Sequence, residues 1–254
     1  MPNNSKLVGF FNKHLVPIYF TCQKDNDIQN FVVTSFVLSI DSQWFLITAG
    51  HCISEIEKLI KIHGYKINSC SLIDSLGLDA RHFEPIPFDY ITSKPVCLSE
   101  NGDFDYGVIF LSSYYKKLLE LNHIQPLNEE VWKKQSAKID FYMLIGIPYK
   151  LIKVTPNNLE IKTTLHEVKL IDKRPEEFPD TDTPLFYGCI TLDESVTDIE
   201  GMSGGPIFGF YKNDKNELRY WLVALQSTWI KKFKFIKACP TNLLGKFLEE
   251  MLRN

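Results

Sequence analysis

The sequence has no long uninterrupted apolar run, and none of its segments approaches the roughly 20 apolar residues that span a bilayer. Its first 20 residues, MPNNSKLVGFFNKHLVPIYF, lack the basic start, apolar stretch and small-residue cleavage site of a secretory signal. The net charge is only −3, so no strong field favours nucleic acid or an anionic membrane. We therefore expect neither as a partner.

The cysteines form no CxxC pair, and no histidine lies at metal-ligand spacing, so we expect no metal and no cofactor. Their even number permits three disulfides, but a chain of 254 residues without a signal favours free thiols. That interpretation predicts a reducing, cytoplasmic compartment. The six are Cys22, Cys52, Cys70, Cys97, Cys189 and Cys239.

Short β-rich segments dominate a chain that is 44% hydrophobic, which is enough for a packed core. The length suits one large domain or two small ones packed together. The recurrence of these β-rich segments, with few long helical patterns between them, predicts an all-β barrel or sandwich. The predicted strands cover 31–40, 43–49, 107–111, 139–147, 159–170 and 220–227.

Two helices and one linker complete the predicted elements. Ser54 and Glu57 fit a capping box, which predicts a short helix after His51. Residues 241–253 place apolar side chains on one stripe at helical spacing, typical of a helix docked on its own protein. Residues 121–127, with a proline and polar residues, are the best linker and divide the chain into two halves.

A glycine-rich turn carries the first sign of chemistry. Residues 199–208 read IEGMSGGPIF, in which Ser203 precedes two glycines and follows Gly201. Acyl transfer by a serine needs an exposed hydroxyl, a base within hydrogen-bond reach and donors for the oxyanion. A sharp turn here would expose the Ser203 hydroxyl and aim the amides of Gly201 and Ser203 at one point. Alone, the run would be only a tight hairpin.

Two further residues supply the base and the acid. His51 lies in TAGHC, directly after a predicted strand, and Asp105 lies at the mouth of the strand in DYGVIFL. Singly, such a histidine is more often structural, and an aspartate at a strand end is usually a turn former. Asp103 is the alternative acid, but only Asp105 is followed by a small residue two positions on and then an apolar strand.

Together, TAGHC, DYGVIFL and GMSGGP resemble the histidine, aspartate and serine motifs of the chymotrypsin-type (trypsin-like) serine peptidases, in that family's chain order. The resemblance implies that Ser203 attacks the scissile carbonyl, His51 acts as general base and acid, and Asp105 orients His51. It also implies an oxyanion hole formed by the amides of Gly201 and Ser203.

The resemblance covers nearly the whole chain and implies its fold. Two six-stranded antiparallel Greek-key barrels would hold the active site between them, followed by a C-terminal helix. Residues 1–120 would form the barrel with His51 and Asp105. Residues 121–254 would form the barrel with Ser203 and end in the helix 241–253.

The sequence departs from the secreted members of that family in its activation residues. Those members mature at an Ile-Val-Gly-Gly-like start, whose new amine pairs with an aspartate just before the serine; here that position is Met202, and no such tetrapeptide exists. In this respect the chain resembles the intracellular and bacterial branch, which has no zymogen activation.

The expected substrate pocket comprises Thr197, Asp198, Ser227, Trp229 and Lys234. Thr197 falls where relatives with basic specificity carry an aspartate, although Asp198, one position on, would restore an acid. A predicted strand over 231–237 places Lys234 on one face, which favours an acidic or polar residue before the scissile bond if that face lines the pocket. Otherwise its lysines protect a solvated edge. Trp229 would narrow the pocket.

These features predict a serine endopeptidase acting on a protein or peptide substrate. Two alternatives stay open. In one, the protease is dormant until an activating partner or ligand binds, because Met202 removes the ion pair that orders the serine loop. In the other, the chain is a catalytically silent, trypsin-like binding module.

Overall fold

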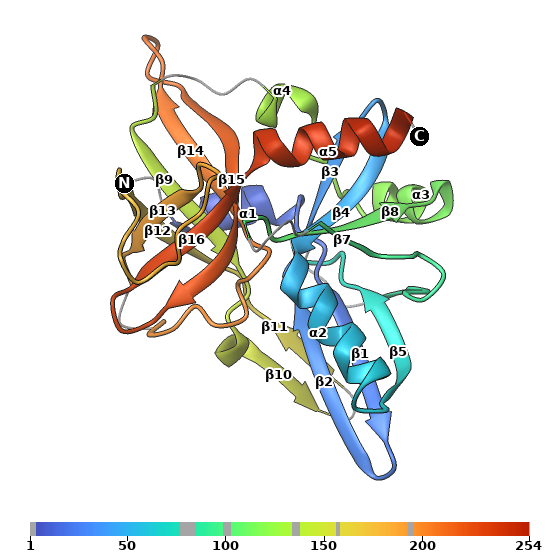
Figure 1. Ribbon diagram of the computed structural model, residues 1–254. Coiled ribbons are helices and arrows are strands. Elements are labelled where there is room, and N and C mark those ends of the chain that lie inside the picture. Colours follow the sequence, from blue (N-terminus) through green and yellow to red (C-terminus); the bar gives the residue numbers. More distant parts are fainter. Residues whose placement is uncertain are drawn as a thin grey trace.

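Six antiparallel strands in the second half of the chain close into a barrel in the order β12-β13-β16-β15-β14-β9 (Figure 1). The computed structural model describes residues 4–76, 85–98, 103–133, 138–155, 158–192 and 196–253. The barrel strands are β9 (Phe141–Gly146), β12 (Thr164–Leu170), β13 (Phe186–Ile190), β14 (Pro206–Lys212), β15 (Leu218–Ile230) and β16 (Phe235–Pro240). The predominantly β fold and one of the two expected barrels are thus confirmed.

In the first half of the chain, the barrel expected over residues 1–120 is not confirmed. Its described strands form two four-stranded sheets, β2-β1-β5-β6 and β3-β4-β8-β7, and no closed barrel. The first contains β1 (Ile18–Lys24), β2 (Asp27–Val33), β5 (Lys66–Leu72) and β6 (Ile86–Pro87). The second contains β3 (Phe36–Ile40), β4 (Gln43–Ala49), β7 (Val96–Leu98) and β8 (Tyr106–Leu111).

A separate hairpin of β10 (Ile152–Thr155) and β11 (Asn158–Ile161) follows the short 3-10 helix η1 (Tyr149–Leu151). Figure 1 shows this hairpin beside the long β1–β2 hairpin, both projecting from the same end of the molecule. The predicted strand 159–170 is therefore wrong as a single element, because it covers β11 and β12. The predicted strand 31–40 likewise divides into β2 and β3 at Thr34 and Ser35.

The described helices are α1 (Asn4–Asn12), α2 (Gly50–Lys61), α3 (Ser113–Leu121), α4 (Glu129–Trp132) and α5 (Thr241–Arg253). The expected C-terminal helix is confirmed as α5, which buries Leu244 and Leu248. The linker expected at 121–127 begins in α3, and Leu127 then forms a parallel bridge with Leu38 of β3. No described helix is long and apolar enough to cross a membrane.

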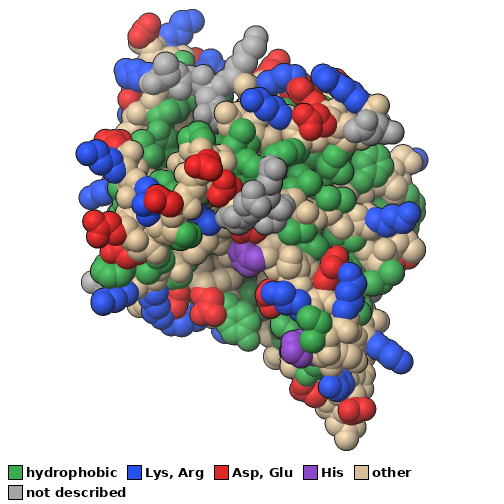
Figure 2. Space-filling model, viewed as in Figure 1, with side chains coloured by type: hydrophobic (Ala, Val, Ile, Leu, Met, Phe, Trp, Pro, Cys, Tyr) green, Lys and Arg blue, Asp and Glu red, His purple; other side chains and the backbone are tan. Residues whose placement is uncertain are grey.

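One core joins the two halves. Phe36 and Tyr106 from the first half belong to the same buried cluster as Phe208 and Leu225 from the barrel. The Tyr106 hydroxyl also donates a hydrogen bond of 2.6 Å to the carbonyl of Pro240. This shared core fixes the start of β8 against the end of β16, where the candidate site lies. Figure 2 shows both signs of charge interspersed over one face.

Candidate active site

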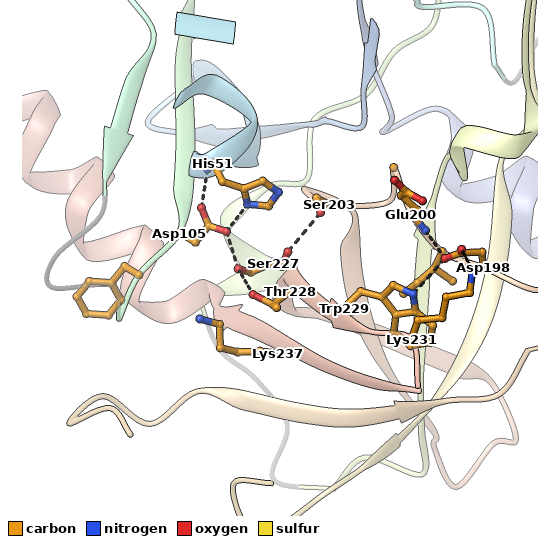
Figure 3. A pocket seen from close by; sticks show the side chains of 13 residues that line it. His51, Asp105, Asp198, Glu200, Ser203, Ser227, Thr228, Trp229, Lys231 and Lys237 are labelled. Atoms are coloured by element: carbon orange, nitrogen blue, oxygen red, sulfur yellow. Dashed lines mark hydrogen bonds and ion pairs between the residues drawn. The ribbon is translucent and has the colours of Figure 1, made fainter. Parts of the chain in front are cut away.

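His51, Asp105 and Ser203 line one cavity of about 640 Å³ (Figure 3). His51 comes from the first turn of α2, Asp105 directly precedes β8, and Ser203 lies in the loop before β14. Asp103, the alternative acid, instead accepts a hydrogen bond of 3.3 Å from the Thr183 hydroxyl and does not line the cavity. The acid beside His51 is therefore Asp105.

Asp105 holds His51 through two hydrogen bonds. Its Oδ2 lies 2.7 Å from His51 Nδ1, and its Oδ1 accepts the His51 backbone N–H, also at 2.7 Å. That N–H is one of the unpaired donors at the start of a helix, so Asp105 also caps α2 although it lies 54 positions away in the sequence. The predicted capping box is wrong, because α2 begins at Gly50 and places Ser54 inside the helix.

Ser227, which we expected in the substrate pocket, lines the cavity and also contacts the acid. Its hydroxyl donates a 2.5 Å hydrogen bond to Asp105 Oδ2. Burial alone would raise the pKa of Asp105, but the hydrogen bonds from His51 and Ser227 outweigh it and hold the pKa below its usual range. Asp105 is therefore ionised at neutral pH. Nothing in the sequence around Ser227 indicated this contact, since the two residues lie 122 positions apart.

The Ser203 hydroxyl points to a different acceptor from the one expected. It donates to the carbonyl of Ser227 at 3.3 Å, and no hydrogen bond joins it to His51 in the described structure. Burial lowers the pKa of His51, but the hydrogen bond to Asp105 and the nearby Cys52 sulfur raise it to about 10. His51 is thus protonated at neutral pH in this arrangement and would need to lose its proton before acting as a base.

Two peptide groups of the loop before β14 are held through their carbonyls. The Glu200 carbonyl accepts the Tyr149 N–H at 2.7 Å, and the Met202 carbonyl accepts the Gly205 N–H at 2.8 Å. In a trans peptide the C=O and the following N–H point in opposite directions. The amides of Gly201 and Ser203 therefore point away from these bonds, and neither has an acceptor among the described residues. This arrangement suits an oxyanion.

Gly201 is required by this geometry. Its φ is +93°, and a Cβ there would lie 2.8 Å from the Tyr149 nitrogen. The Gly201 carbonyl accepts the Thr34 hydroxyl at 2.8 Å, which ties the loop to the end of β2. Met202 is fully buried against Gly146 in the barrel. The burial of Met202 and the hydrogen bonds to the loop carbonyls thus hold the loop in place. In the secreted peptidases that the sequence resembles, the N-terminal ion pair has this role.

No protein-family model and no curated protein matches the sequence. The inactivated protease paralogue S-I1 of the scabies mite superposes with a TM-score of 0.55 and 14% identity, covering 95% of this chain and 94% of that one. The serine protease AL20 from an extremophilic microorganism superposes with a TM-score of 0.52 and 12% identity, covering 96% and 99%. The fold is that of chymotrypsin-like serine proteases.

Within this chymotrypsin-like fold, the carboxylate of Asp198 already accepts hydrogen bonds from other residues of the protein. Asp198 is buried, and its carboxylate accepts the Trp229 indole N–H at 3.1 Å, the Glu200 N–H at 3.1 Å and the Lys231 ammonium at 2.5 Å. Burial would raise the pKa of Asp198, but Lys231 and the two N–H donors lower it overall. The carboxylate is thus neutralised by Lys231, which sequence reasoning did not assign to the pocket.

Lys234 and Thr197 lie outside the cavity. The predicted strand 231–237 is wrong, because β15 extends to Ile230 and a turn separates it from β16. Lys234 lies in that turn with a φ of +56°, and it does not line the cavity. Thr197 is exposed and accepts the Lys150 ammonium at 3.4 Å. Lys237 of β16 lines the cavity in their place.

Proposed function

We propose that this protein is a serine endopeptidase that hydrolyses peptide bonds through an acyl-enzyme formed on Ser203. The supporting observation is the geometry of one cavity. Asp105 binds both the backbone and the ring of His51 there, and the unbonded amides of Gly201 and of Ser203 itself lie in the same loop. The chymotrypsin-like fold, at 12–14% identity to its neighbours, is compatible with this chemistry.

The proposed reaction begins with a rotation of the Ser203 side chain. Its hydroxyl leaves the Ser227 carbonyl and turns toward neutral His51, which takes the proton as Ser203 Oγ attacks the scissile carbonyl. The amides of Gly201 and Ser203 donate to the oxyanion that forms. His51 then gives the proton to the leaving amine, and water releases the acyl group by the same route in reverse.

No N-terminal ion pair is needed in this proposal, as in the intracellular and bacterial relatives that the sequence resembles. Met202 is buried where secreted members place an acid, and the loop is held by Thr34 and Tyr149. All six cysteines are free thiols, which suits a reducing, cytoplasmic location. The proposed partner is a protein or peptide substrate, without nucleic acid or membrane.

Labelling with a fluorophosphonate, read by intact mass, tests the nucleophile. We expect one label on the wild type, none on Ser203→Ala, and an unchanged label on Ser112→Ala, an exposed serine at the start of α3. Cleavage of denatured β-casein by wild type but not by Ser203→Ala, read by mass spectrometry, tests the endopeptidase. A folded wild type that is neither labelled nor cleaves casein would contradict the proposal.

A dormant or silent protein is the second candidate, favoured by one observation. The Ser203 hydroxyl is bonded to the Ser227 carbonyl and not to His51, which is protonated at neutral pH. One protein of similar fold is named as an inactivated protease paralogue. A dormant enzyme would be labelled slowly at neutral pH and faster with an activating partner. A silent binding module would stay unlabelled at every pH.

A further inference from the structure

The cavity that contains the proposed nucleophile also contains a lysine without an acid of its own. Lys237 of β16 lines this cavity together with Ser203 and Thr228. Its side chain is half-buried, and no hydrogen bond or ion pair holds its ammonium among the described residues. A partly buried charge without a counter-charge is unfavourable, so it favours a ligand that supplies the opposite charge.

The other lysine of the cavity is neutralised by acids. Lys231 lies 2.5 Å from the Asp198 carboxylate, and the hydrogen bond to Asp198 and the nearby charge of Glu200 raise the pKa of Lys231. Acid and lysine therefore compensate each other on that side of the cavity. Lys237 has no such acid beside it in the part of the chain that the structure describes.

The strand register places Lys237 close to the proposed catalytic acid. Lys237 pairs with Thr228 of β15, and the side chains of directly opposed residues share one face of a sheet. Thr228 follows Ser227, whose hydroxyl binds Asp105. Figure 3 shows Lys237 beside Thr228, on the far side of Ser227 from His51. Lys237 therefore lies one strand position from the residue that holds the acid.

The proposed reaction decides which part of a substrate reaches Lys237. His51 gives its proton to the leaving amine, so the departing segment lies on the side of His51. The acyl segment stays bonded to Ser203 and lies on the opposite side, toward Thr228 and Lys237. Lys237 would therefore contact residues that precede the scissile bond.

The size of the cavity limits how far back these residues lie. A compact cavity of about 640 Å³ is about 9 Å across, which an extended chain crosses in about three residues. We expect the residue directly before the scissile bond to enter the other end of the cavity, where Asp198 and Trp229 lie. A side chain that reaches Lys237 then belongs to the second, third or fourth residue before the bond.

We infer that Lys237 gives this peptidase a preference for substrates with an aspartate or glutamate two to four positions before the scissile bond. This inference rests on the proposed peptidase function, whose substrate class it specifies. The carboxylate of such a residue would accept a charge-assisted hydrogen bond from the Lys237 ammonium. The cavity excludes part of the water around this pair, which strengthens the attraction.

A library of synthetic peptides of mixed sequence tests the preference without knowledge of the cleaved sequence. The new peptide ends are read by mass spectrometry after incubation with the protein. We expect aspartate and glutamate to be favoured about fivefold over asparagine and glutamine at one of the three positions. Lys237→Met should remove this preference, whereas Lys237→Arg keeps the charge and should retain it.

Reversal of the charge measures the contact directly. Three peptides share the best-cleaved sequence and carry glutamate, glutamine or lysine at the preferred position. Wild type should favour glutamate over lysine by at least about tenfold in kcat/KM, and Lys237→Glu should favour lysine, because both interactions change sign. Lys169→Met is the control, since Lys169 is an exposed lysine of β12 outside the cavity. Equal thermal unfolding midpoints would show that the variants fold.

The outcomes separate this inference from the peptidase function. A wild type that is labelled by the fluorophosphonate and cleaves peptides without a preference for acids would refute the role of Lys237 alone. An acid preference that survives in Lys237→Met and Lys237→Glu would refute it as well. A folded wild type that is neither labelled nor cleaves any peptide would refute the peptidase, and the acid preference with it.

Discussion

Replacing Thr34 by valine should loosen the Ser203 loop while keeping the shape of the core. Thr34 is fully buried between β2 and β3. Its hydroxyl donates to the Gly201 carbonyl at 2.8 Å and accepts the Ile147 N–H at 3.3 Å. Valine has nearly the same volume, so the change removes both hydrogen bonds without leaving a cavity.

The magnitude follows from the two groups left without partners. An unsatisfied buried polar group costs about 1–3 kcal/mol, and the longer bond to Ile147 belongs at the low end of that range. We therefore expect Thr34→Val to lower the free energy of unfolding by about 2–4 kcal/mol. Because the Gly201 carbonyl loses its anchor, the fluorophosphonate labelling rate should also fall, by about tenfold.

Chemical denaturation of matched variants checks this estimate. Thr34→Ser keeps the hydroxyl and removes one methyl group, which should cost about 1 kcal/mol. The order of stability should therefore be wild type, then Thr34→Ser, then Thr34→Val. A Thr34→Val protein as stable as Thr34→Ser would refute the assignment of this hydroxyl as the anchor of the loop.

Four further predictions concern the same cavity. Asp105 and its surroundings raise the pKa of His51 to about 10, and His51 must be neutral to act as a base. The rate of fluorophosphonate labelling should therefore rise about tenfold per pH unit from pH 7 and level off near pH 10. A rate that is already constant from pH 7 would contradict this. Because the pKa of His51 is higher in the folded protein, its protonated form stabilises the fold. This stabilisation is complete below the unfolded-state pKa of about 6.5 and is lost as the pH rises through 10; denaturation at several pH values measures it. Lys231→Ala should free the Asp198 carboxylate from its ion pair. An arginine thioester should then acylate this variant about tenfold faster than the wild type. Equal rates would show that Asp198 does not reach the substrate. Gly201→Ala forces a φ of +93° on a residue with a Cβ and should reduce the labelling rate at least about tenfold. Labelling at the wild-type rate would exclude a role for the Gly201 amide.

The sequence alone determined the local features of the protein. Short apolar segments rich in β-forming residues predicted β4, β8, β9 and β15 with small errors at their ends, because buried strands are built from neighbouring apolar residues. The stripe over 241–253 predicted α5 for the same reason. The motifs around His51, Asp105 and Ser203 also marked three residues that the fold brings to one cavity.

The groups that those residues contact depend on how distant segments pack together. The Ser227 hydroxyl binds Asp105, Lys231 neutralises Asp198, and Thr34 anchors Gly201. These partners lie 122, 33 and 167 positions apart, so no local pattern of the chain reports them. The two sheets of the first half likewise depend on which strand edges meet. Pairing of edges is fixed by packing between distant segments, which a single sequence does not encode locally.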